Sequence, residues 1–251
     1  LYIVIKDLDG NIINKINAPK SKGLNRVAWN LRHSSSSAIN PDRISSGRGG
    51  GRGRYSSGHL ASPGQYTATL TKEDQGISSN LDEPIEFNVV DLERGTLQGM
   101  GYKEYSNHAE NVIQLQNRQA QFSDRLNENM NMVKAMRLSL SRSNSTNNDL
   151  SNRLFELEET LNQMSKKVYG NSAKSEVGVK NDPTVSSYIG NAYRGLTSTY
   201  GPTGQHKQSL SIANNMLNKL DVELNNIIAK MPNLKVELDN MNAPIIIGGN
   251  N

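Results

Sequence analysis

Cysteine is absent from the 251-residue chain, which excludes disulfides, cysteine-ligated zinc sites and thiol catalysis. Aromatic residues make up only 5% of it, with a single tryptophan, Trp29. This lean composition favours a helical bundle plus a small sheet over a deeply buried enzyme core. Long apolar runs are also missing, since none approaches the roughly 20 residues that span a bilayer. No signal-peptide pattern is visible.

The first residues already read as a strand, because Leu1 opens the run LYIVIKD. We therefore expect a fragment of a longer protein, with any signal or lipid anchor lying upstream. A chain of this length accommodates one large domain or two ordinary ones.

Positive charge is concentrated in the first part of the chain. Residues 1–60 hold ten Lys or Arg and three Asp, a balance of +7, whereas the remainder holds eighteen basic and twenty-one acidic residues, a balance of −3. Because the excess is local, the overall net charge of +4 does not indicate a nucleic-acid-binding protein.

Short alternating segments with turn residues between them predict strands in the first ninety residues. Asp9-Gly10 is a hairpin signal between strands at 1–6 and 12–16. A third strand is expected over 23–31, either with a bulge or beginning at Asn25, and two more over 65–70 and 85–89. Together they suggest a small antiparallel sandwich with Trp29 at the centre of its core. The inward positions expected in the third strand are Leu24, Val27, Trp29 and Leu31.

A Gly/Arg-rich insertion separates the third and fourth predicted strands at 34–62. Its centre, SGRGGGRGRYSSG, contains Arg48, Arg52, Arg54 and Tyr55. Such tracts can bind single-stranded RNA through phosphate contacts and arginine stacking. This tract is short and has one aromatic residue, so we favour an exposed, flexible insertion. A third interpretation is a basic loop that rests on an acidic partner.

Three segments carry a family resemblance: GLNRVAWNLR at 23–32, ASPGQYTATLTKEDQG at 61–76 and LDEPIEFNVV at 81–90. They resemble the C-terminal region of large bacterial proteins, common in Bacteroidota, that carry sortilin-type (VPS10-like, BNR-repeat) β-propellers. The resemblance covers residues 1–95, with Asn30 where the family usually has Asp and Ala68 where it has Val. It implies an immunoglobulin-like sandwich similar to the FlgD Ig-like domain, preceded by propellers that this chain does not contain. The trailing helical segment, with Asn242–Pro244, is also similar to that family's end.

Helical periodicity replaces the strand pattern after residue 96. Apolar residues step by three and four over 103–140, 150–168, 185–196 and 203–231, and a short stretch continues past Pro232. Thr146, Asp182 and Thr203 are the expected N-terminal caps, and Gly170 ends one helix. Short connections favour an up-down bundle of about four helices over one long coiled coil. The most regular apolar seam consists of Leu210, Ala213, Leu217, Leu220, Leu224, Ile227 and Met231.

The predicted fold is therefore α+β, all-β and then all-α. An immunoglobulin-like antiparallel sandwich occupies residues 1–95, and an up-down helical bundle of about four helices occupies 96–251. Met130, Met132 and Met136 are expected as core gap-fillers, the alternative being an adaptable binding face. The tail contains Ile245, Ile246 and Ile247, which lie beyond the last predicted helix. We expect this segment either to add a strand to another element or to pack against the bundle.

Residues able to carry chemistry do not form a recognisable reaction centre in the sequence. The four histidines, His33, His59, His108 and His206, are scattered without ligand spacing, and His33 and His59 look exposed. Two aspartates at 7 and 9 fall short of the six to eight oxygens that calcium takes. Glutamates at 156, 158 and 159 are typical of a solvated helix face. Gly47–Gly53 lacks the GK[ST] of a phosphate-binding loop. No cofactor or metal is expected.

Three functional hypotheses follow, in order of preference. The first is a non-catalytic structural and interaction module, the C-terminal part of a secreted or envelope-associated β-propeller protein, located in the periplasm, at the outer membrane or outside the cell. Its partner would be its own propeller or an envelope complex, contacted through Arg48, Arg52, Arg54, Tyr55 and Ile245–Ile247. The second is an accessory domain of a sialidase-like or other glycan or peptide hydrolase. The third is nucleic-acid binding through the Arg-Gly loop.

Overall fold

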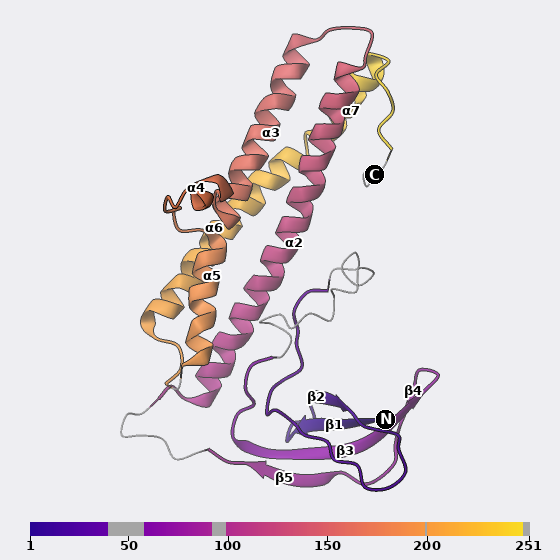
Figure 1. Cartoon of the computed structure of the whole chain (residues 1–251), viewed down its shortest axis with the longest axis vertical. Helices are drawn as coiled ribbons and strands as arrows, with labels where there is room; N and C mark the ends of the chain where they lie inside the picture. Colours follow the sequence, from indigo (N-terminus) through magenta and orange to yellow (C-terminus); the bar gives the residue numbers. More distant parts are fainter. Residues whose placement is uncertain (40–57, 92–98, 199, 248–251) are drawn as a thin grey trace. The chain divides into compact units, whose positions relative to one another are not determined.

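The computed structural model describes residues 1–39, 58–91, 99–198 and 200–247. These fall into two compact units. The sheet unit comprises residues 1–113 and 196–202, and the helical unit comprises 114–195 and 203–251. Sheet precedes helices along the chain, which confirms the predicted α+β class (Figure 1).

One antiparallel sheet of five strands forms the sheet unit. The strand order is β2-β1-β3-β4, and β5 pairs with the other end of the long strand β3. The Asp9-Gly10 hairpin signal is confirmed, because Gly10 has φ 82° between the paired strands β1 and β2. Strand bounds are β1 Tyr2–Asp7, β2 Ile12–Asn17, β3 Gly64–Asp74, β4 Ile77–Asn80 and β5 Ile85–Val89.

The apolar face of this sheet is covered by an irregular segment that carries Trp29. Side chains on this face come from alternate positions of the strands, because residues two apart in a strand share a face. The Trp29 ring meets Tyr66 and Phe87 edge-on, with centroids 5.5 and 6.0 Å away. Trp29 therefore packs on the core, as the sequence predicts. The core consists of Ile5, Ile13, Ala61 and Tyr66, with Ile3, Ile16, Trp29, Ala68, Phe87 and Val89 partly buried around it.

The strand predicted over 23–31 is wrong, because this segment has no strand conformation. Asn25 donates its amide to the carbonyls of Ser21 and Gly23, and such local side-chain bonds compete with a strand ladder. Leu24, predicted to face inward, is 99% exposed, and Leu31 has a positive φ of 56° and is also exposed. The described strands thus form one sheet, and the immunoglobulin-like pairing of two sheets stays a prediction.

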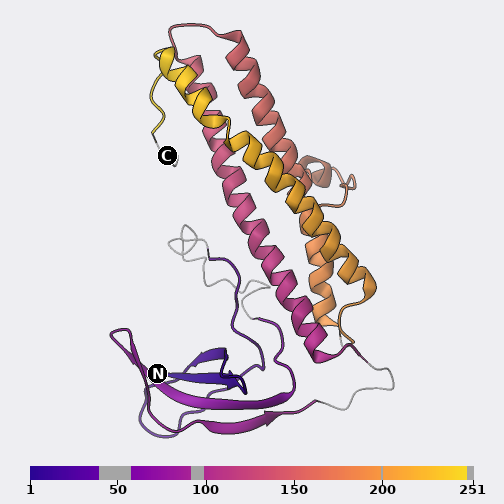
Figure 2. The ribbon, with the colours of Figure 1, turned by 180° about the vertical axis from the view of Figure 1, so that it is seen from behind.

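Helices account for most of the remaining described chain. They are α2 Tyr102–Ser141, α3 Asn148–Tyr169, α4 Ser172–Glu176, α5 Val185–Arg194, α6 Gly204–Ile228 and α7 Met231–Asn240, with a 3₁₀ turn at Gly195–Thr197. Residues 102–113 of α2 belong to the sheet unit. Within the helical unit α6 packs against α3 and α5 (Figure 2). No helix in the described ranges has the length and apolarity that a membrane crossing requires.

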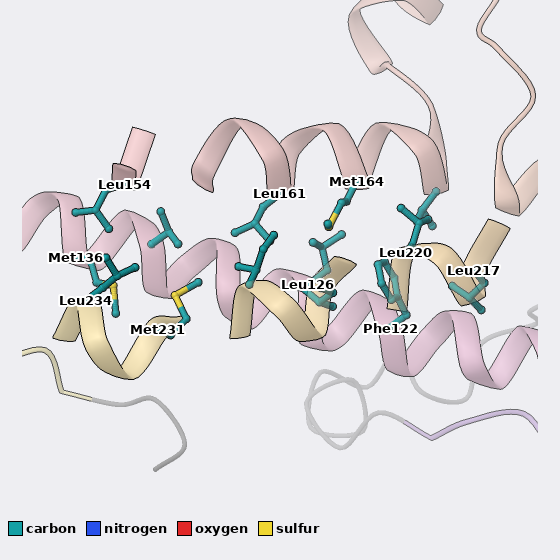
Figure 3. Close-up of a cluster of buried hydrophobic side chains, with 14 of the residues drawn as sticks. Phe122, Leu126, Met136, Leu154, Leu161, Met164, Leu217, Leu220, Met231 and Leu234 are labelled. Atoms are coloured by element: carbon teal, nitrogen blue, oxygen red, sulfur yellow. The ribbon is translucent and has the colours of Figure 1, made fainter. Parts of the chain in front are cut away.

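The predicted apolar seams form the core of the helical unit. Side chains from α2, α3, α6 and α7 point toward one another, among them Phe122, Leu154, Leu217 and Leu234 (Figure 3). Met136 is buried in this core, and the partly buried Met130 and Met132 pack against it. A regular four-helix up-down arrangement stays a prediction.

Two of the three predicted N-terminal caps are displaced by one or two residues, whereas Thr203 caps α6 as predicted. Asn147, not Thr146, caps α3 by accepting a bond from the Leu150 amide. Thr184, not Asp182, caps α5 in a reciprocal box with Ser187. All four residues are of types that are common N-caps, so residue type alone does not fix the first residue of the helix. Gly170 ends α3 with φ 91°, as predicted.

Candidate functional site

The predicted contact residues Arg48, Arg52, Arg54 and Tyr55 lie outside the described residues. The predicted apolar tail follows α7 and is held by the Ser139 hydroxyl, which donates to the Pro244 carbonyl at 2.7 Å. Ile246 packs against the helical core. Ile245 and Ile247, in contrast, are 85% and 95% exposed. The tail therefore rests on the helical unit and presents these two side chains to the outside of that unit.

Two short segments near the two ends of the Gly/Arg-rich insertion lie side by side in the sheet unit. We call residues 31–34 and 58–61 the loop base. The His33 amide donates to the His59 carbonyl and the Gly58 amide to the His33 carbonyl, both at 2.9 Å. Ala61 donates to the Leu31 carbonyl at 2.8 Å. The Arg32 guanidinium adds a bond to the Gly58 carbonyl at 3.1 Å. The two ends of the insertion are thus joined by a short antiparallel ladder.

The loop base is also attached to the sheet. The Ser34 amide donates to the Ile13 carbonyl of β2 at 2.8 Å. The carbonyl of Arg32 accepts two further bonds, from the Asn14 side chain at 2.7 Å and from the Trp29 indole at 2.9 Å. The tryptophan of the core therefore positions the loop base directly.

Gly58 is required by the close approach of the two segments. A Cβ atom at this position would lie 2.7 Å from the carbonyl oxygens of His33 and Ser34 and 2.8 Å from the Cβ of His33. Since real Cβ atoms do not make such contacts, only glycine lets the backbones come this near.

Two histidine rings stack at the centre of the loop base. The centroids of His33 and His59 are 4.0 Å apart, and the rings are inclined by 20°. His59 is only 8% exposed, and neither of its ring nitrogens has a hydrogen-bond partner among the described residues. The edge of Tyr105 approaches the same ring, with centroids 6.5 Å apart. The prediction that both histidines are exposed is thus wrong for His59 and only partly right for half-buried His33.

Burial makes the neutral form of both rings the favoured one. Desolvation, with the nearby charges of His33 and Arg32, lowers the pKa of His59 to about 4. Desolvation also lowers the pKa of His33, although the carboxylates of Glu110 and Asp7 oppose this shift. The pair is therefore uncharged at neutral pH, and its titration is coupled because the rings are in contact.

The chemistry available at this site is proton uptake by the two imidazoles. Their proximity follows from the backbone ladder, which aligns positions 33 and 59 although they are far apart in sequence. The described residues contain no cluster of three or more potential metal ligands. The only hint in the sequence is that the two histidines lie near the two ends of the insertion.

Other predicted candidates have structural partners. The Asp7 carboxylate accepts bonds from the Asn11 amide and side chain at 2.8 and 3.0 Å, which closes the first hairpin. Glu158 pairs with Arg137, and the His206 ring accepts a 3.0 Å bond from the Thr203 amide at the start of α6. These roles account for residues that the sequence singled out.

Two arginines of α2 bind a polar row along α6 in the helical unit. Arg118 and Arg125 both reach the carboxylate of Asp221, at 3.2 and 3.5 Å. The arginines also bind side-chain amides on either side of it, at Asn214, Asn218 and Asn225. Another ion pair, between Arg153 and Glu237, joins α3 to α7. Hydrogen bonding to Arg153 lowers the pKa of Glu237. These polar contacts border the apolar core.

No family model, curated protein or solved structure matches this chain.

Proposed function

We propose that this chain is a non-catalytic structural and interaction module, the C-terminal part of a secreted or envelope-associated β-propeller protein. It braces the propeller or docks it to a partner protein. The observation that supports the proposal is that aromatic residues from the three motif segments are in contact. Trp29 from GLNRVAWNLR, Tyr66 from PGQY and Phe87 from EPIEF form one aromatic cluster in the sheet unit.

This contact gives the resemblance a physical basis. Aromatic residues in three separated segments form edge-to-face and stacked pairs, which stabilise beyond their buried area. The same tryptophan fixes the loop base through its indole bond. A family whose sandwich is built on these three segments would need these residue types at these positions. In this proposal the sheet and its Trp29 segment correspond to the immunoglobulin-like sandwich, and the helices correspond to the trailing bundle.

The docking surfaces in this proposal are the basic insertion and the apolar tail. Exposed Ile245 and Ile247 flank an anchored Ile246, so the tail offers a pair of apolar side chains on a fixed backbone. A partner that covers these two side chains would remove their apolar surface from water, which favours binding.

Binding in trans tests the proposal. The region encoded before Leu1 would be expressed separately and titrated with this chain by isothermal calorimetry. We expect a one-to-one complex that weakens at least fivefold in the double variant Ile245→Ser, Ile247→Ser. The matched control is Val222→Ser on α6, also an exposed aliphatic residue, which should bind as the parent chain does.

Two results would contradict the proposal. One is a preceding region without propeller repeats. The other is turnover of a glycoside or peptide substrate by this chain alone, with normal Michaelis kinetics.

A further inference from the structure

The two segments of the loop base are joined by few interactions. Residues 31–34 and 58–61 are joined by three backbone hydrogen bonds and by the Arg32 bond to the Gly58 carbonyl. Gly58 allows the two backbones to touch. The two segments are therefore held together at one place in the sheet unit by a small number of contacts.

The side chains at this place are two stacked imidazoles. The stack is favourable while both rings are neutral, because their faces are in contact at 4.0 Å and His59 is buried. His59 has no hydrogen-bond acceptor among the described residues for a proton on either nitrogen. A second proton on this pair would be buried, unpaired and next to a like charge.

The surrounding charges decide which ring takes up a proton first. Arg32, on the same segment as His33, disfavours charge on His59. Asp7 at the end of β1 and Glu110 on α2 favour charge on His33. Among the described residues, two further titratable groups of α2 lie nearby, namely Tyr105, whose ring meets His59, and the buried His108 one turn further along. We therefore expect His33 to protonate first and His59 to resist.

We propose that the His33–His59 stack is an acid-sensitive latch that joins residues 31–34 to residues 58–61. The latch is closed while the stack is neutral. Protonation of the pair separates the rings and breaks the backbone bonds between 31–34 and 58–61, while the sheet remains folded. The inference stands apart from the proposed docking function, since it concerns only the contacts at the loop base.

Amide hydrogen exchange on the full chain tests the latch. Protection factors of the His33, Gly58 and Ala61 amides would be compared at pH 7.5 and pH 4.5. We expect them to fall at least tenfold at the lower pH, while those of the β1–β3 ladder change less than threefold. A parallel fall of the ladder amides would show that the whole unit unfolds, and unchanged protection at the loop base would show that protonation does not open it. Either result overturns the proposal.

A variant that keeps the stack but cannot take up a proton gives the matched comparison. In His59→Phe the fall in protection should shrink to less than twofold. His206→Asn, which removes an imidazole from the helical unit, should leave the fall unchanged. Persistence of the full fall in His59→Phe contradicts the latch.

If His59→Phe does not fold, the titration of the histidine rings in the parent chain, followed by NMR, tests the proposal instead. In the parent chain the His59 ring should titrate below pH 5, together with the chemical-shift changes of the Gly58 amide. Titration of His59 near the ordinary value of about 6.5, or no response at Gly58, overturns the proposal.

Discussion

The helical unit buries Leu, Val, Ile and Met side chains from several helices in one continuous core, whereas the sheet unit fully buries few apolar side chains, Ile5, Ile13, Ala61 and Tyr66 among them. The sheet unit relies more on hydrogen bonds around Trp29 and the loop base. Apolar burial is insensitive to pH, whereas a buried imidazole is not. The two units should therefore respond differently to truncation and to acid.

The largest effect is expected in the helical core. Leu217→Ala should lower the free energy of unfolding of the helical unit by about 3–4 kcal/mol, because Leu217 is fully buried and the neighbouring helices cannot collapse onto the gap. Urea unfolding followed by circular dichroism at 222 nm measures it. Val222→Ala, on the same helix but 61% exposed, should change stability by less than about 0.5 kcal/mol. Equal effects of the two substitutions would contradict the packing described.

The next largest effect concerns the tryptophan of the sheet unit. Trp29→Ala should destabilise this unit by about 2–3 kcal/mol, less than a fully buried ring because Trp29 is only half-buried. Amide signals of β1 and β3 in increasing urea provide the measurement. Leu24→Ala, in the same segment, is the control and should be neutral because Leu24 is exposed. A neutral Trp29→Ala would remove the aromatic cluster as the basis of the proposed function.

Acid should destabilise the loop base of the sheet unit and leave the helical core unchanged. The folded pKa of His59 lies at about 4, below the ordinary 6.5. The unfolded chain therefore binds more protons between these values. The stability that the neutral His59 ring gives the loop base is therefore full above pH 6.5 and is lost as the pH falls toward 4, by roughly 1–2 kcal/mol. Exchange of the Gly58 amide at pH 7.5 and pH 4.5 should show the drop in the parent chain and not in His59→Phe. The reverse trend would show that His59 carries a proton in the folded state.

The smallest effect is expected at the polar row between α2 and α6. Asp221→Asn should cost at most about 1 kcal/mol at low salt and less at 1 M salt, because both arginines remain partly exposed. Asp124→Asn, an exposed acid on α2, is the control and should be neutral. A loss that does not depend on salt would indicate a packing effect rather than an ionic one.

The helical unit was the more predictable of the two from sequence. Its seams repeat every three and four residues, so Leu217, Leu220 and Leu224 were placed in the core correctly. Neighbouring residues of equal capping ability, such as Thr146 and Asn147, left the helix starts uncertain by one or two positions. Periodicity determines the buried face but not the first residue of a helix.

The sheet unit was less predictable because local and long-range bonds decide its structure. Apolar alternation suggested a strand over 23–31, but the Asn25 side chain binds nearby carbonyls instead. Strand β4 was missed because all four of its side chains are exposed and give no alternating signal. The His33–His59 contact joins two positions on opposite sides of the insertion, and no spacing rule identifies such a pair.

The polar row has a consequence for how α2 and α6 can align. If α6 slid by one turn along α2, about 5.4 Å, an asparagine would occupy the place of the next polar residue and the amide bonds could form again. The carboxylate of Asp221 would then no longer lie between Arg118 and Arg125. Because the row contains a single acid among amides, its negative charge distinguishes the native alignment from the shifted ones that the leucine seam alone would tolerate.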